Sequence, residues 1–514
     1  MGSNVKAIVV HNANIFTGRG HAGAMLISEG RVMAIGDEEE ILSAAEGIAC
    51  EKIDAGGNVV LPGLIDSHMH LLETGTEMLM GSLRDYRSIA ALVKSLKERC
   101  SDLPFLISGG WDEENFEERR LPDREDLDKI STDRPVMLFR FCHHVVSVNS
   151  FVMERTGIER AGEVSGGIIG RDSSGRPNGI LYDRAIDHIL DYRKQLISGI
   201  AEQAVEMAAR YAASKGITTL MPLDADDLEF RKCREMVSSG RIPCRIRMFL
   251  SHDTFMDYLK VPPAVENDFF RVSGVKIFAD GSFGGRTALL SEPYADSGTA
   301  GLQLAGVEEM SAAMSAAVSA GKIVAVHAIG DRAIINTLNA ASLSGIPSHL
   351  LRIEHVALTP PAVVEALSAF RPHLVVQPHF LVGDWWLQRR LGSRAEQCYL
   401  FRTFLRKGME PAGSSDSPVE PLDPWTGILA AVDRGRHAAS PMADLAPSER
   451  LSPEEALKMY TTWAGKSTNE EGRLGTLEEG SYADFVIMEE KSVDNLIQNS
   501  RVLMTFVAGS RIYP

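Results

Sequence analysis

The chain has 514 residues, of which 44% are hydrophobic, and its formal net charge is -16 at pH 7. This length suits a large barrel with additions, and this proportion of apolar residues can bury a substantial core. The strongly negative charge argues against nucleic acid and anionic membranes as partners, because both are bound by clustered Lys and Arg.

The cysteines and the start of the chain bear on the cellular compartment. The six cysteines, at positions 50, 100, 142, 233, 244 and 398, include no Cys-x-x-Cys pair. They are predicted to be reduced packing residues, as in a reducing compartment. The first residues lack the apolar stretch of a signal peptide, and no apolar run approaches membrane-spanning length. We therefore expect a cytoplasmic protein with no membrane partner.

Both ends of the chain are predicted to form short strands. The apolar runs that indicate them lie at 8–10, 24–27, 31–35, 482–488 and 502–507. They are bounded by glycines and other turn residues. We expect the two sets to pair into one small β-sandwich domain made of residues 1–60 plus 470–514.

The central region, residues 61–469, alternates short apolar runs with helical stretches, which is typical of a parallel α/β fold. Eight candidate strands end near His70, Leu223, Leu250, Phe278, His327, His355, Val376 and Ala412. Helical segments between them include 200–215, 310–320 and 362–370. Eight strands with intervening helices predict a (β/α)8 TIM barrel.

The gap between the first and second candidate strands is too long for one helix. Residues 75–195 are therefore predicted to form an insertion, a lid over the mouth of the barrel. Insertions at the carboxyl ends of barrel strands commonly shape the substrate site.

The motif His68-Met69-His70 ends the first of these strands. Side chains two apart in a strand point the same way, so both imidazoles project into one small volume. Two converging neutral imidazoles can bind a divalent metal ion. A pair of solvated histidines in a turn is the alternative, because so short a motif often arises by chance.

Four further strand ends carry residues of metal-ligand type, namely Lys276, His327, His355 and Asp416. Each has an ordinary structural alternative. A strand-end histidine can be a hydrogen-bonded core residue, Lys276 can extend to the rim, and Asp416 can cap the next helix. Five strand ends with such residues together favour a metal centre at the barrel mouth.

Motifs of one family occur along nearly the whole chain. They include 61–70 (LPGLIDSHMH), 109–112 (GGWD), 148–150 (VNS), 276–282 (KIFADGS), 327–333 (HAIGDRA), 415–419 (SDSPV) and 474–480 (LGTLEEG). Through these segments the chain resembles the amidohydrolase superfamily, in the branch of YtcJ-like metal-dependent hydrolases, amidohydrolase family 3. The resemblance implies a distorted TIM barrel with a composite β domain built from both termini.

The resemblance also implies a metal centre. Its ligands would be His68, His70, Lys276, His327, His355 and Asp416. The first two histidines and the aspartate would bind one ion, the other two histidines a second, and a carboxylated Lys276 would bridge them. The metal is expected to be a divalent ion; zinc, iron and manganese are all compatible, and zinc is preferred. The centre is expected to hold one or two ions.

Two segments depart from the family pattern. Cys142-His143 stands where family members often carry Asp-Gly, before His144. In Gln377-Pro378-His379-Phe380 the histidine comes one place earlier than expected. Both segments are predicted to face the substrate, so the departures bear on specificity more than on metal binding.

The predicted activity is hydrolysis of a carbon–nitrogen bond, other than a peptide bond, in a small molecule by metal-activated hydroxide. Asp416 would accept the proton of water and deliver it to the leaving nitrogen. A deaminase of the same superfamily and a catalytically inactive scaffold are the alternatives. An N-acyl amino acid, an N-substituted formamide, a small peptide or a cyclic amide would suit the same centre, and a homo-oligomer is compatible with the sequence.

Three residues are candidates for substrate contact. Trp111 could form the wall of an apolar pocket or pack inside the lid. His144 could donate a hydrogen bond to the substrate carbonyl or make a purely structural bond. Arg286 could bind a substrate carboxylate in bidentate fashion, or form a surface salt bridge.

Overall fold

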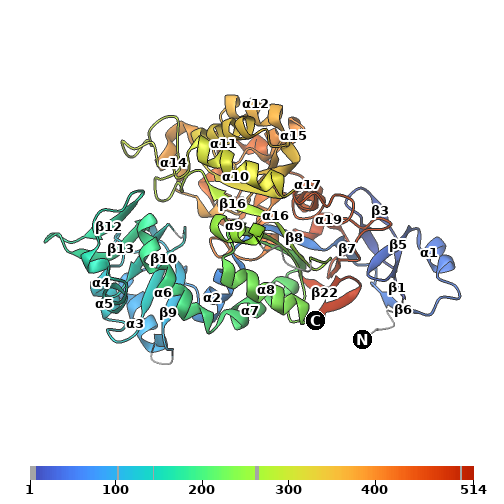
Figure 1. The fold of residues 1–514 in the computed structure, drawn as a ribbon. Coiled ribbons are helices and arrows are strands. Elements are labelled where there is room, and N and C mark those ends of the chain that lie inside the picture. The colour runs from blue at the N-terminus through green and yellow to red at the C-terminus, as the bar shows by residue number, and fades with distance from the viewer. Residues whose placement is uncertain (1–6, 101–102, 143, 261–265, 498–499) are drawn as a thin grey trace.

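The computed structural model describes residues 7–100, 103–142, 144–260, 266–497 and 500–514. A central barrel has an inserted α/β unit on one side and a set of β-strands from both chain ends on the other (Figure 1). The fold is therefore the predicted TIM barrel with a β-sandwich from both termini and an insertion after the first barrel strand. The predicted bounds of the three parts remain predictions, namely 1–60 with 470–514 for the β-sandwich, 61–469 for the barrel region and 75–195 for the insertion.

Eight parallel strands form the barrel sheet, in the order in which they occur along the chain. They are β8 (Leu64–Met69), β14 (Ile217–Pro222), β15 (Arg245–Ser251), β16 (Phe270–Phe278), β17 (Ile323–Ala328), β18 (Leu351–His355), β19 (His373–Val376) and β20 (Ala412–Gly413). The first and last lie side by side, since the Asp416 amide donates to the His68 carbonyl at 2.8 Å. The predicted strand ends are confirmed to within a few residues.

Helices cover the outside of the barrel, so its strands are buried on both faces and consist of apolar runs. The main ones are α2 (Leu71–Met80), α7 (Ala201–Ser214), α8 (Asp227–Ser238), α10 (Val307–Ser319), α11 (Asp331–Ser344), α12 (Pro361–Phe370) and α16 (Pro424–Asp433). Helices α2 and α7 pack closely, and a Cβ on Gly75 of α2 would lie 1.9 Å from the Ala204 carbonyl oxygen. Glycine and a row of buried alanines allow this approach.

Strands from the two ends of the chain form two further sheets, in which most strand pairs are antiparallel. One contains β1 (Ala7–His11), β4 (Ala24–Ser28), β5 (Arg31–Gly36) and β6 (Cys50–Asp54). The other contains β2 (Asn14–Phe16), β3 (His21–Ala22), β7 (Val59–Pro62), β21 (Phe485–Met488), β22 (Val502–Val507) and β23 (Ser510–Tyr513). Val10 and Met25 of the first sheet share an apolar cluster with Phe485 and Phe506 of the second. This shared core makes the two sheets a sandwich.

The insertion is built on a five-stranded sheet of its own. In spatial order its strands are β12 (Gly167–Arg171), β13 (Pro177–Asp183), β11 (Val145–Val148), β10 (Val136–Arg140) and β9 (Leu106–Trp111). The helices of this unit are α3 (Ile89–Cys100), α4 (Arg124–Asp128), α5 (Ser150–Thr156) and α6 (Asp187–Ser198). Helix α6 is the one that reaches the site, because several of its side chains line the cavity at the barrel mouth.

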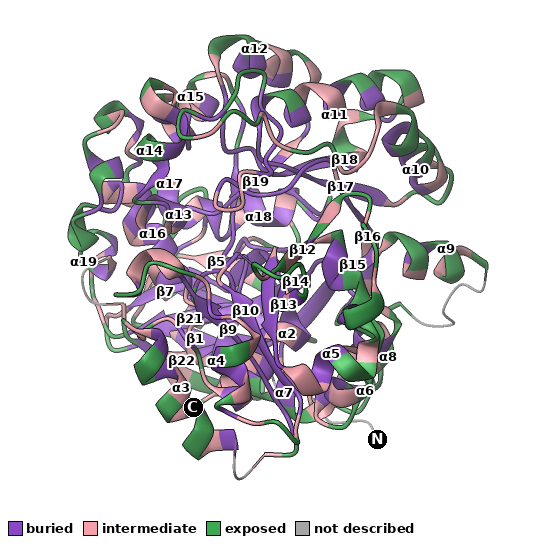
Figure 2. Cartoon of the chain, turned by 90° about the vertical axis from the view of Figure 1, so that its left-hand side faces the viewer, coloured by how far each residue is buried: buried purple, intermediate pink, exposed green. Residues whose placement is uncertain are grey.

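Burial follows this layering, with buried residues concentrated in the strands and exposed ones on the outer faces of the helices (Figure 2). All six cysteines are free thiols, as predicted. Among the helices that the structure describes, none is both long and apolar enough to cross a membrane.

Candidate active site

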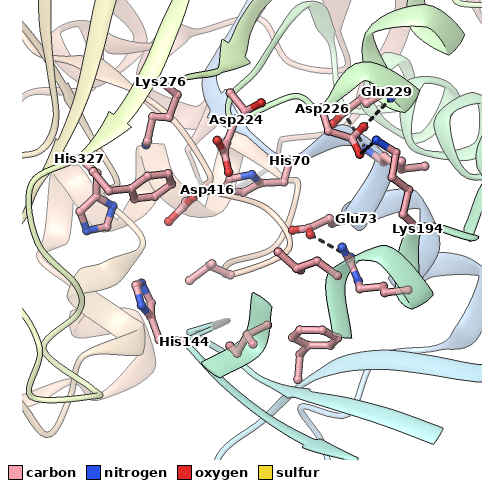
Figure 3. A pocket seen from close by; sticks show the side chains of 18 of the residues that line it. His70, Glu73, His144, Lys194, Asp224, Asp226, Glu229, Lys276, His327 and Asp416 are labelled. Carbon is pink, nitrogen blue, oxygen red and sulfur yellow. Dashed lines mark hydrogen bonds and ion pairs between the residues drawn. The ribbon is translucent and has the colours of Figure 1, made fainter. Parts of the chain in front are cut away.

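A cavity of about 510 Å³ opens at the carboxyl ends of the barrel strands. All six predicted metal ligands line it: His68, His70, Lys276, His327, His355 and Asp416. Side chains of the inserted unit, chiefly from α6, form the facing wall (Figure 3). The structure thus brings together residues that are up to 348 positions apart in the sequence, because parallel barrel strands all end on one face.

His68, His70 and Asp416 form the tightest group of donor atoms. Oδ1 of Asp416 lies 3.2 Å from Nε2 of His68 and 3.3 Å from Nε2 of His70. One donor atom from each residue lies within 4.8 Å of the others, a spacing that can hold a metal ion. The His68 side chain is only 1% exposed, so the alternative of two solvated turn histidines is wrong.

Lys276 lies inside the barrel rather than at its rim. It is 1% exposed, and its Nζ is 3.4 Å from Nε2 of His68 and 5.0 Å from the centre of the Phe278 ring. Burial lowers the pKa of this amine, because an ammonium ion loses its hydration there. The structure therefore excludes the alternative in which Lys276 extends to solvent.

His327 and His355 lie next to each other on the neighbouring strands β17 and β18, with ring centres 4.4 Å apart. Burial lowers the pKa of both rings well below the usual range, so both are neutral. Nε2 of His327 faces the Gly281 carbonyl at 3.0 Å, and Nδ1 of His355 faces Oε1 of Gln377 at 2.8 Å. Each ring donates to that oxygen, which leaves one nitrogen with a free lone pair for a metal.

The backbone at this face is held in an unusual conformation. The φ angles of Asp224, His355 and Asp416 are 59°, 72° and 56°, in the left-handed region that non-glycine residues seldom adopt. The neighbouring loop is fixed by Asp66, which accepts hydrogen bonds from the amide and the hydroxyl of Ser415 at 3.0 and 2.5 Å. Such strain, kept in place by surrounding contacts, is common at functional sites.

His144 is the predicted substrate-contacting residue that the structure places in the cavity. Its Nδ1 donates to Oδ1 of Asp183 at 2.9 Å, and its ring centre lies 6.1 Å from that of His327. Figure 3 shows its ring across the cavity from the barrel strands. The bond to Asp183 orients the ring and leaves Nε2 available toward the cavity.

Trp111 and Arg286 do not line the cavity. Trp111 is fully buried within the inserted unit, where its Nε1 donates to the Leu138 carbonyl at 3.0 Å. Arg286 pairs with Asp296 at 2.9 Å, and its side chain is 37% exposed. Trp111 thus packs inside the inserted unit and Arg286 forms a surface salt bridge, which are the structural alternatives that the sequence left open for them.

The segments that depart from the family pattern both reach the site. Cys142 lines the cavity and its sulfur accepts a hydrogen bond from Arg140 at 3.3 Å, whereas His143 lies outside the described residues. In the other segment Gln377 orients His355, and His379 pairs with Glu420 at 2.6 Å.

The sequence reasoning missed two charged residues inside strand β18. Oε2 of Glu354 lies 2.8 Å from Nδ1 of His68, and Arg352 donates to Oε1 of Glu354 at 2.9 Å. The two residues are fully buried. Their charges in an otherwise apolar strand were the signal that could have found them, since buried charges are kept only when paired.

A second group that the sequence reasoning missed is acidic. Besides Asp191 of α6, four carboxylates from the barrel line the cavity on the side of α6 and α8, namely Glu73, Asp224, Asp226 and Glu229. They follow the first and second barrel strands, and residues after barrel strands are where site residues are expected.

The centre also borders a mainly apolar space. A smaller chamber of about 60 Å³ shares His144, His327, His355 and Asp416 with the main cavity. Its other walls are mainly aromatic and aliphatic, and the aromatic ones are Phe141, Phe283, Phe380, Trp386 and Tyr399. The centre thus borders an acidic chamber and a mainly apolar one, whose lining also includes the buried acids Asp384 and Glu420.

A parallel barrel with histidines, a buried lysine and an aspartate converging at its mouth defines the class of metal-dependent hydrolase barrels. The comparisons with known proteins agree. The model of the amidohydrolase family matches residues 51–513. The chain belongs to the amidohydrolase family.

Relatives are similar over almost their full length. The amidohydrolase YtcJ of Bacillus subtilis (strain 168) is 32% identical, with 90% of each chain covered. The N-substituted formamide deformylase of Arthrobacter pascens is 25% identical, covering 99% of this chain and 98% of its own. Among solved structures, an uncharacterised metal-dependent hydrolase of Pyrococcus horikoshii OT3 superposes with a TM-score of 0.83 at 27% identity, over 95% and 98% of the two chains.

Proposed function

We propose that this protein hydrolyses a carbon–nitrogen bond of the amide type, other than a peptide bond, in a small molecule. The observation that carries the proposal is the convergence of His68, His70 and Asp416 at 3.2–3.3 Å beside the buried amine of Lys276. The N-substituted formamide deformylase among its relatives acts, by its name, on a bond of this type.

The donor set fits a divalent cation, with zinc as the proposed ion. Neutral histidines and a carboxylate are ligands that zinc prefers. His68, His70 and Asp416 would hold one ion, and His327 and His355 would hold a second. A bound cation would polarise the substrate carbonyl and acidify water near neutral pH.

Lys276 is proposed to act as a carboxylated bridge between the two positions. Carboxylation joins carbon dioxide to an unprotonated amine with loss of one proton, and burial lowers the pKa of Lys276, which favours the unprotonated amine. The resulting carbamate would place an anionic oxygen ligand beside His68, whose Nε2 is 3.4 Å from Nζ.

Asp416 is proposed to move the proton of the reaction. Its Oδ1 lies within 3.3 Å of Nε2 of both His68 and His70, and the residue lines both chambers. From there the carboxylate can accept a proton from attacking water and deliver it to the leaving nitrogen. His144, whose Nδ1 donates to Asp183, is proposed to act as an imidazolium that also donates from Nε2 to the carbonyl oxygen as negative charge develops on it.

A metal-reconstitution screen tests the proposal. The purified protein is analysed for bound metal, stripped, reloaded with zinc, manganese or iron, and assayed against libraries of amides, cyclic amides, esters and aminated heterocycles. Metal binding with turnover of amides is the expected result. Turnover of aminated rings alone would identify a deaminase instead, and a protein that neither binds nor responds to any metal would be a scaffold.

A further inference from the structure

We propose that the acidic chamber is a subsite for a cationic nitrogen, so that the substrates are amides carrying an ammonium or guanidinium group near the cleaved bond. This inference rests on the proposed function and narrows its substrate class. It follows from the four barrel acids of the chamber wall, two of which form no ion pair with any described residue.

Two of the four acids are already paired by the inserted helix α6. Glu73 accepts from Arg193 at 2.8 Å, and Asp226 accepts from Lys194 at 3.0 Å. Figure 3 draws both contacts at the side of the cavity away from His327. These pairs join α6 to the barrel and neutralise the outer part of the wall.

Asp224 is not paired in this way. Among the described residues its carboxylate has no hydrogen-bond or ion-pair partner, although it lies near His70 and Lys276. Figure 3 shows it between these two residues, with its carboxylate directed into the cavity. It is also absent from the group of donor atoms, within 4.8 Å of one another, that His68, His70 and Asp416 form. Asp224 therefore faces the substrate space rather than completing that group.

Glu229 is the second carboxylate without a cation. It is 7% exposed, and its Oε1 accepts from the Leu72 amide at 3.1 Å. No described lysine, arginine or histidine pairs with it, and it lines the same cavity as Asp224. Burial raises the pKa of both acids, to about 6 for Asp224 and about 8 for Glu229, because a carboxylate loses its hydration there.

A cationic group of the ligand would supply the missing charge. An ammonium donates three hydrogen bonds and a guanidinium five, which suits the carboxylate oxygens of Asp224 and Glu229. A neutral or anionic substituent would leave the carboxyl groups of Asp224 and Glu229 without a charged partner in the cavity, and this is costly. The mainly apolar chamber beside the centre would then hold the uncharged part of the substrate.

The test compares matched substrates on the zinc-loaded enzyme. N-(2-aminoethyl)-, N-(3-aminopropyl)- and N-(4-aminobutyl)acetamide are assayed against N-propyl-, N-butyl- and N-pentylacetamide, and 4-aminobutanamide against pentanamide. We expect kcat/KM to favour the cationic member of at least one pair by about tenfold or more, as a charge-assisted hydrogen bond implies. Cationic-to-neutral ratios near one in every pair would overturn the inference.

Variants test whether Asp224 and Glu229 cause the preference for cationic substrates. In Asp224→Asn and Glu229→Gln the cationic-to-neutral ratio should fall toward one, whereas Asp227→Asn, on the exposed start of α8, should keep the wild-type ratio. Metal content is measured for each variant. Loss of bound zinc in Asp224→Asn would make Asp224 part of the metal centre and would overturn its role in cation recognition.

A binding measurement separates this inference from the proposed function. Calorimetry on the zinc-loaded protein compares butane-1,4-diamine with butane-1,4-diol, and does not depend on turnover. We expect the diamine to bind at least about tenfold more tightly and to lose this advantage in Asp224→Asn. Equal binding of the two would overturn the subsite even if amides are hydrolysed, and a diamine preference without amide hydrolysis would overturn only the proposed function.

Discussion

Nδ1 of His68 lies 2.8 Å from Oε2 of Glu354, and both side chains are buried. The carboxylate also accepts from Arg352, so its own position is fixed by a second contact. Burial lowers the pKa of His68 well below the usual range, which makes the ring neutral, with its proton on Nδ1 and the lone pair of Nε2 facing Asp416. Glu354 thus orients a candidate metal ligand without touching the metal position.

Substitution of Glu354 by Gln is the first prediction. It should weaken zinc binding by about 10- to 100-fold, as the loss of carboxylates behind histidine ligands does. Zinc affinity is measured by competition with a chromogenic chelator. Glu365→Gln, on the exposed surface of α12 where it pairs with Lys407, is the matched control and should bind zinc like the wild type. Unchanged affinity in Glu354→Gln would contradict the assigned role.

The barrel and its metal-ligand candidates were predictable, because parallel strands buried on both faces produce apolar runs that end at the site. Glu354 was not predicted as a partner of His68, because 286 positions separate them and only the closed barrel joins them. Arg286 shows the converse. Its charge suggested a substrate contact, but the loop after it folds back and places Asp296 at 2.9 Å. The sequence contains no periodic pattern that indicates which side chains will pair across a loop.

Asp416→Asn is the second prediction. The amide cannot accept and return the proton, so kcat should fall by about 10²- to 10⁴-fold, the usual contribution of a general acid–base group. Rates are expressed per bound zinc, so that any loss of metal is counted separately. Circular dichroism should stay unchanged. A kcat per zinc close to that of the wild type would assign proton transfer to another group.

Lys276→Ala is the third prediction and addresses the proposed carbamate. Removal of the side chain should abolish most activity, and added formate or acetate should restore part of it, because a small carboxylate can occupy the vacated position beside His68. Activity is measured with and without 100 mM formate. Rescue by methylamine but not by formate would indicate that the wild-type residue acts as an amine, contrary to the proposal.

Asp384→Asn is the fourth prediction and concerns the dependence of stability on pH. Burial raises the pKa of Asp384 to about 7, against an ordinary value of 3.8, while Tyr399 donates a hydrogen bond to it. A carboxyl whose pKa is higher in the folded than in the unfolded state favours folding at low pH, and this contribution is lost as pH rises from about 4 to about 7. Asparagine keeps an acceptor for Tyr399 but does not ionise.

The free energy of unfolding of the wild type, relative to Asp384→Asn, should therefore fall by about 2 kcal/mol between pH 5 and pH 8. Urea unfolding at the two pH values measures this difference. Asp444→Asn is the control, because its side chain is 83% exposed and removing it should leave the pH dependence unchanged. If the difference between wild type and Asp384→Asn stays constant, or rises with pH, Asp384 is ionised in the folded protein and the assigned direction of its pKa shift is wrong.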